Sequence, residues 1–235
     1  MNERIDVREL LGLRQGPLAV GFLKSTPAGL KRWDGPPLAA GCGFWPQVDD
    51  RGAFYTLAED HQHCAVGCHT HRLPLPPERE GDLPRAIGLM TGCGYIDAKE
   101  VAGIPVLPVT PQAVAYGPAD DPGFQADVVI VAANPAQAML LYEAALKAGA
   151  GGALTNTLGR PACAVLPLTV RAGSAAASFG CKGNRIHTGL PEGEMYVSIP
   201  AAKWDAVKRA LLETCKANEA MGAYYVEHRE EVERV

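Results

Sequence analysis

The sequence predicts an α/β protein of the mixed α+β kind: a single compact domain over residues 1–235, built on a mixed β-sheet with flanking helices. The segment 127–148 provides the first observation, because a buried strand there leads directly into an alanine-rich helix. Composition provides the second, since 47% hydrophobic and 20% charged residues are typical of a globular protein. The third is the 26 glycines and 19 prolines, which predict short elements joined by sharp turns.

The first elements are predicted from apolar spacing and from the residues that stop it. Residues 3–11 place apolar side chains on roughly one helical face, and Gly12 is a plausible stop. Residues 17–23 are apolar at nearly every position, as expected for a strand buried on both faces. A polar, proline-bearing link then reaches 41–45, where glycines flank Cys42 and allow either a tight turn or close approach to a ligand.

Further elements follow the same rules. Asp82 is a candidate N-cap, Pro84 suits a first helical turn, and glycines follow the predicted end of that helix. Additional strands are predicted at 53–56, 112–116, 162–166 and 194–199. Additional helices are predicted at 82–90, 97–102, 170–176 and 201–217, with a charged C-terminal helix over 218–235.

The clearest local prediction is the β-α unit at 127–148. Asn134 is placed to cap the helix, Pro135 suits its first turn, and Gly149 follows its end. Ligands often bind where such strands lead into helices, so Asn134 and Gln137 are candidate cofactor-binding residues. A purely structural cap is an equally good interpretation.

Charge and hydropathy exclude several classes of protein. A net charge of −4 and a pI near 5.9 argue against a nucleic-acid partner, which would require a basic patch. The longest apolar run, 128–133, is too short to span a bilayer, and the charged first residues do not resemble a secretory signal. We therefore expect no membrane association and a cytoplasmic location, where the seven cysteines would be buried, metal-bound or reactive.

The segment 59–71 holds two cysteines, four histidines and two carboxylates within thirteen positions. If it is one helix, Asp60, Cys64, Cys68 and His71 share a face. Thiolates and imidazoles are ligands for zinc, iron and copper, so a local zinc site is possible. The three residues between the cysteines and the lack of an export signal argue against covalent haem. A second interpretation is catalytic, with Cys64 as nucleophile and His61 or His71 as base.

Other motifs of the sequence narrow the range of functions further. The sequence contains no glycine-rich dinucleotide motif, no phosphate-binding loop and no nucleophile elbow of α/β-hydrolases. A second glycine-flanked cysteine, Cys181, is followed by Lys182 and Arg185.

These stretches together resemble the prokaryotic family known as domain of unknown function 169. The matching stretches are Cys42-Gly43-Phe44-Trp45, Phe54-Tyr55-Thr56, Asp60-His61, Cys64-x-Val66-Gly67, Thr70-His71, Asp127-Val128-Val129, Asn134-Pro135-x-Gln137-Ala138-Met139, Pro161-Ala162-Cys163, Gly180-Cys181-x-Gly183-Asn184-Arg185 and Glu194-Met195-Tyr196. The resemblance implies a one-domain α/β protein without a settled biochemical role. It also distinguishes the motif cysteines (Cys42, Cys64, Cys163 and Cys181) from Cys93 and Cys215, and marks Cys68 and Arg72 as departures from the family pattern.

The four motif cysteines predict a [4Fe–4S] cluster or another thiolate-bound metal, with a redox or small-ligand role. Glycine-flanked cysteines present backbone N–H donors to a cluster, and Lys182 and Arg185 could offset its negative charge. Two alternatives stay open, so enzymatic activity is undecided. One is a thiol-dependent enzyme that uses Cys64, with Arg185 holding an anionic substrate. The other is a non-catalytic small-molecule-binding protein whose cysteines are merely buried. The candidate partners are a small-molecule ligand or a redox partner.

Overall fold

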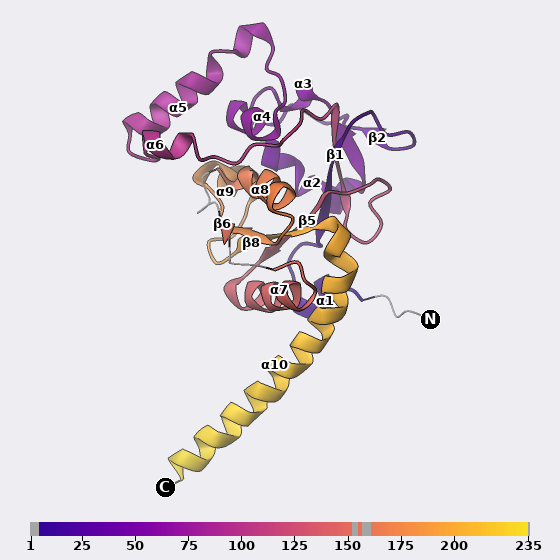
Figure 1. Cartoon of the computed structure of the whole chain (residues 1–235), viewed down its shortest axis with the longest axis vertical. Helices are drawn as coiled ribbons and strands as arrows, with labels where there is room; N and C mark the ends of the chain where they lie inside the picture. Colours follow the sequence, from indigo (N-terminus) through magenta and orange to yellow (C-terminus); the bar gives the residue numbers. More distant parts are fainter. Residues whose placement is uncertain (1–4, 152–154, 157–160, 235) are drawn as a thin grey trace.

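An eight-stranded mixed β-sheet with helices on both faces forms the protein in a computed structural model (Figure 1). The structure describes residues 5–151, 155–156 and 161–234. The strands are β1 (Leu18–Leu23), β2 (Lys31–Arg32), β3 (Phe54–Thr56), β4 (Ala113–Pro118), β5 (Val128–Ala133), β6 (Thr155–Asn156), β7 (Ala176–Ser178) and β8 (Met195–Pro200). They lie in the order β2-β3-β4-β1-β5-β8-β7-β6, which confirms the predicted α/β class.

Helical segments connect most of these strands. The α-helices are α1 (Val7–Leu11), α2 (Gln47–Arg51), α3 (Ala58–His61), α4 (Ala65–His71), α5 (Asp82–Gly92), α6 (Ala98–Val101), α7 (Pro135–Lys147), α8 (Val165–Ala172), α9 (Lys182–Thr188) and α10 (Trp204–Glu233). The 3₁₀ turns among the described residues are η1 (Gly41–Phe44), η2 (Pro77–Arg79), η3 (Ala162–Ala164) and η4 (Ala201–Lys203). Several are short, as the glycine and proline content predicts.

Antiparallel pairing dominates the centre of the sheet. Strand β1 is antiparallel to both β4 and β5, and β5 is antiparallel to β8. The described strands pair in parallel only at the two ends, β2 with β3 and β6 with β7.

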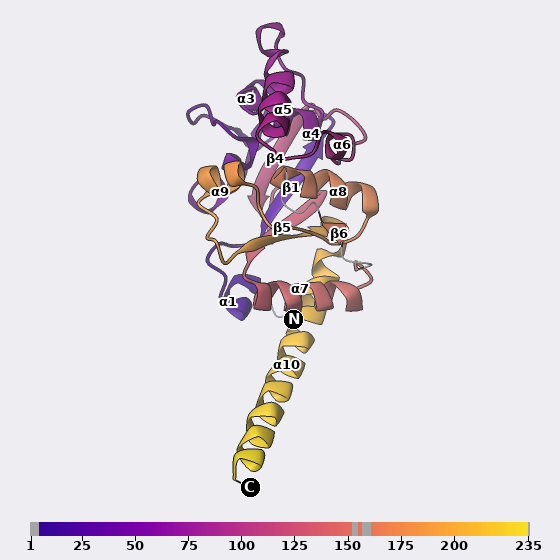
Figure 2. The same ribbon diagram turned by 90° about the vertical axis from the view of Figure 1, so that its left-hand side faces the viewer.

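Both faces of the central strands are buried. Along β5, Val128 and Ile130 belong to one hydrophobic core, whereas Val129 and Val131 belong to the other. Alternate residues of a strand point to opposite faces, so an apolar run of this kind requires helices above and below the sheet. Helices α1, α7 and α10 lie on one side, and α4, α8 and α9 lie on the other (Figure 2).

The helix caps follow the sequence closely. Gly12 ends α1 with a φ of 63°, a left-handed conformation that glycine adopts without strain. Asn134 and Gln137 form a reciprocal capping box at the start of α7, with Pro135 in the first turn. By contrast, Gly81 rather than Asp82 is the N-cap residue of α5. The Asp82 carboxylate instead pairs with Arg79 and Arg85.

The strand predicted at 162–166 is wrong, and the helix predicted at 170–176 is confirmed only for residues 170–172. The first segment forms η3 and the start of α8 instead of a strand, and the second contains the end of α8 and the start of β7. Ala162 to Leu166 are all buried, and a short apolar run cannot distinguish a buried helix from a buried strand. The sequence also predicts a loop at 155–160. Residues 155–156 instead form β6, while 157–160 fall outside the described residues.

One continuous helix, α10, replaces the two helices predicted at 201–217 and 218–235. Its first half packs against α7 through residues such as Val207 and Leu211. Its second half projects away from the sheet and is exposed (Figure 1). No helix in the described parts of the chain is both long enough and apolar enough to cross a membrane.

Removal of the residues after Ala217 is expected to leave the free energy of unfolding unchanged within about 0.5 kcal/mol. The reason is that the last buried residue of α10 is Cys215. Urea unfolding of the full-length and shortened chains would measure this. Leu211→Ala is the control. It should lower the free energy of unfolding by about 2–5 kcal/mol, because it creates a cavity against α7. A comparable loss on truncation would contradict the prediction.

Candidate functional site

The four motif cysteines each lie at the start of a helical turn. Cys42 is in η1 and Cys163 is in η3, while Cys64 and Cys181 are the N-cap residues of α4 and α9. These elements contact one another, since η1 packs against α4, α9 and η3. The fold therefore brings together four cysteines that are widely separated in the sequence.

All four side chains line one cavity of about 270 Å³, called the thiol cavity below. The other lining residues are Ala39, Ala40, Val66, Gly67, Met90, Tyr95, Ile96, Ile104, Pro161, Ala162, Lys182, Gly183, Asn184 and His187. Residues 82–104, which contain α5 and α6 and are called the arm below, contribute Met90, Tyr95, Ile96 and Ile104. The arm projects beyond the sheet (Figure 2), and no residue of α5 or α6 is buried.

Backbone N–H groups point at two of the thiols. The Gly67 N–H donates to Cys64 Sγ at 3.3 Å, and the Asn184 N–H donates to Cys181 Sγ at 3.3 Å. Glycine is needed at position 67, because a Cβ atom there would lie 2.9 Å from Cys64 Sγ. Both donors belong to the first turn of a helix, where the backbone N–H groups have no partner within the helix.

The remaining two thiols are nearly closed off from solvent. Cys42 and Cys163 are each 7% exposed. Burial raises the pKa of Cys42 to about 12, while the Asn184 side chain acts in the opposite direction. Burial also raises the pKa of Cys163, and repulsion from Cys64 and Cys42 adds to this effect. Both thiols therefore hold their protons at neutral pH unless a cation replaces them.

The hypothesis of a single helix over the histidine-rich segment is wrong. The segment forms two helices, α3 and α4, and a break before Cys64 makes that residue the N-cap of the second. Cys68 is buried and its thiol donates to the His61 carbonyl oxygen at 3.2 Å. It does not line the thiol cavity. The local Cys64 and Cys68 zinc pair is therefore not assembled, because the two thiols have different surroundings.

The two candidate bases, His61 and His71, are buried beside the thiol cavity and do not line it. His61 Nε2 lies 2.8 Å from Thr56 Oγ1, and the rings of His61 and His71 are 6.4 Å apart. Burial lowers the pKa of His61 to about 3 and that of His71 to about 4. For His61, the neighbouring His71 adds to the effect. Within the described residues neither imidazole hydrogen-bonds to Cys64, so this arrangement does not place a base on that thiol.

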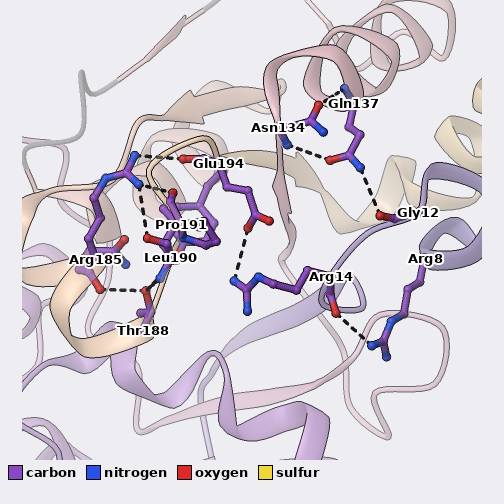
Figure 3. A network of polar contacts seen from close by, with 12 residues as sticks. Arg8, Gly12, Arg14, Asn134, Gln137, Arg185, Thr188, Leu190, Pro191 and Glu194 are labelled. Carbon is purple, nitrogen blue, oxygen red and sulfur yellow. Dashed lines mark hydrogen bonds and ion pairs between the residues drawn. The ribbon is translucent and has the colours of Figure 1, made fainter.

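The two cationic candidates, Lys182 and Arg185, have different surroundings. Lys182 is exposed at the edge of the thiol cavity, and its backbone N–H donates to the Tyr95 hydroxyl at 2.9 Å. Arg185 does not line the cavity. Its guanidinium donates to the carbonyl oxygens of Leu190, Pro191 and Glu194 at 2.5–3.4 Å (Figure 3). It also donates to the Phe179 carbonyl oxygen at 2.5 Å. Arg185 therefore joins the two ends of α9 rather than facing a ligand in the cavity.

Asn134 and Gln137 lie away from the thiol cavity. Their side chains cap α7 reciprocally, and Gln137 Nε2 also donates to the Gly12 carbonyl oxygen at 3.3 Å (Figure 3). The same nitrogen donates to the Leu11 carbonyl oxygen at 2.9 Å. The polar groups of both residues thus have structural partners, in agreement with the structural interpretation of this cap.

Sequence reasoning did not single out Asn184, His187 or the apolar residues of the arm. Asn184 lies within the motif 180–185, and its burial is the property that makes it notable. The spacing of Met90, Ile96 and Ile104 contains no signal that they would line the same cavity as the cysteines.

Comparison with known protein families matches residues 6–209 to domain of unknown function 169, described as an uncharacterised ArCR family. The chain belongs to this family. The match confirms the resemblance predicted from the motifs and includes all four cysteines of the thiol cavity. It ends within α10, so the projecting half of that helix lies outside the domain of unknown function 169. No curated protein and no solved structure matches the chain.

The buried histidines are expected to make the domain less stable in acid. In the unfolded chain each would titrate near 6.5, whereas the folded state lowers the pKa of His71 to about 4. The unfolded state therefore binds more protons below pH 6.5, and stability falls as pH decreases, by about 1.4 kcal/mol per pH unit and histidine. Unfolding free energies at pH 6.5 to 4.5 would show this. His71→Gln removes one titrating histidine, so the slope of unfolding free energy against pH should fall by about 1.4 kcal/mol per pH unit. The control His228→Gln, at an exposed site, should leave that slope unchanged.

Arg185→Lys is expected to lower the free energy of unfolding by roughly 1–3 kcal/mol, although the positive charge is retained. The reason is that the lysine ammonium group cannot reproduce the hydrogen bonds that the planar guanidinium donates to several carbonyl oxygens. Chemical denaturation is the measurement. Lys182→Met, at the exposed edge of the cavity, should change stability by less than about 0.5 kcal/mol. Equal effects of the two variants would refute the structural role assigned to Arg185.

Proposed function

We propose that this protein binds an iron–sulfur cluster, in its simplest form [4Fe–4S], through Cys42, Cys64, Cys163 and Cys181. The observation that carries the proposal is that four cysteines from four separate segments line one cavity. Four thiolates are the usual ligand set of such clusters.

The size of the thiol cavity favours a cluster over a single ion. Four thiolates bound to one zinc at about 2.3 Å must place their sulfur atoms about 3.8 Å apart. Among the described residues, no three histidine, cysteine, aspartate or glutamate side chains are grouped closely enough to hold a metal ion. A cluster places iron and sulfide between its thiolates, so it suits ligands that surround a space of about 270 Å³.

The electrostatics of the thiol cavity support the same proposal. Burial raises the pKa of Cys42 and Cys163, so free thiolates are disfavoured there until a soft cation binds. Backbone N–H groups at Cys64 and Cys181 would stabilise the negative charge of the bound sulfur. Lys182 lines the edge of the cavity and would add positive charge nearby.

When bound, a cluster would supply one-electron transfer or a site for a small ligand. The residues of this chain would hold it, exclude most solvent through the arm, and offset its charge. A redox partner or small ligand would approach beside Lys182 and His187, which are the exposed polar side chains of the lining. We place the protein in the cytoplasm, because its seven cysteines are free thiols and an iron–sulfur site needs reduced cysteine.

The test is the iron and acid-labile sulfide content of protein purified without oxygen, together with its visible spectrum. We expect iron and sulfide in about equal amounts. Conversion of any one of the four cavity cysteines to alanine should reduce both, because each supplies a ligand to the same cluster.

Cys93→Ala and Cys215→Ala are the controls, since neither residue lines the thiol cavity, and both variants should retain full iron and sulfide. Protein without iron, sulfide or another metal would contradict the proposal. One thiol of unusual reactivity in that protein would favour the thiol-dependent enzyme, with Cys64 as the residue to label first.

A further inference from the structure

Asn184 is the buried polar side chain of the thiol cavity. It lies in the first turn of α9, is 1% exposed, and follows Cys181 by three residues. Its backbone N–H donates to Cys181 Sγ at 3.3 Å, so its main chain already serves one of the four cysteines.

The side-chain amide of Asn184 has no such partner. Neither its nitrogen nor its oxygen has a hydrogen bond of ordinary geometry to any described residue. Asn184 and Cys42 nevertheless line the same cavity, and α9, which carries Asn184, packs directly against η1, which carries Cys42. The Tyr196 hydroxyl is also nearby, and the Asn184 side chain lowers its pKa, although burial raises that pKa overall. Buried amides are nearly always paired, so an unpaired one beside a cavity indicates that its partner is the species bound in that cavity.

The surrounding chain restricts the position of this amide. Gly180 has a φ of 80°, and a Cβ atom there would lie 3.1 Å from Asn184 Oδ1. At the other end of α9, Thr188 Oγ1 donates to the Asn184 carbonyl oxygen at 2.8 Å. The amide is therefore held between a glycine that leaves room for it and a helix fixed at its far end.

We infer that the Asn184 amide N–H donates a hydrogen bond to the Cys42 sulfur of the bound cluster and thereby raises the reduction potential of that cluster. This inference rests on the function proposed above. A hydrogen bond to a ligating sulfur withdraws negative charge from the cluster, which favours the reduced state. Asn184 is thus a residue that tunes the cluster and is not one of its ligands.

Asn184→Leu tests the inference, because leucine has a similar volume and no donor. We expect the variant to take up as much iron and sulfide as the wild type and to have a lower midpoint potential. Without the cluster it should melt at the same temperature as the wild type or higher, since an unpaired buried amide is lost. The increase in melting temperature on cluster loading should be smaller than in the wild type.

Tyr196→Phe is the matched control, because it removes the hydroxyl beside Asn184 and leaves the amide in place. Its midpoint potential should equal that of the wild type. If Asn184→Leu does not fold, Asn184→Ala replaces it, with the same expected fall in potential. A loaded variant with the wild-type potential would overturn this inference alone, whereas wild-type protein that binds neither iron nor sulfide would overturn both proposals.

Discussion

The burial of both faces of the central strands is the constraint on which the rest of the structure depends. Strands β5 and β8 contribute residues to both hydrophobic cores, so helices must cover the sheet above and below. Helices α7 and α10 meet this need on one side, while α8 and η1 contribute to it on the other. Without either layer, a row of valine and isoleucine side chains would face water.

The candidate site arises from the second of these layers. Covering that face requires several short helical segments. Four of them have a motif cysteine at the N-cap or in the first turn, and these four cysteines line one cavity. The first N–H groups of a helix are unpaired, and at Cys64 and Cys181 they are directed at sulfur. The same arrangement that completes the core thus produces a place suited to bound negative charge.

Much of the local structure was predictable, and the errors share a cause. The β-α unit at Asn134, the end of α1 at Gly12 and most strands follow from caps and apolar spacing. The segment from Ala162 to Leu166 was predicted as a strand because its side chains are apolar at every position, and a deeply buried helix has the same pattern. A single helix over 59–71 would place Cys64 in its interior, and the sequence does not show that the chain breaks before this residue.

By itself, the sequence determined the fold class, the family and the four cysteines that belong together, because these follow from local spacing and from motifs along the chain. Tertiary structure alone decided that those cysteines share a cavity, that Arg185 bonds to backbone carbonyls, and that the Asn184 amide is buried without a partner. The physical reason is that these properties depend on which distant segments come into contact. Burial and hydrogen bonding across a core are set by the packing of the whole chain, and neighbouring residues in the sequence do not encode them.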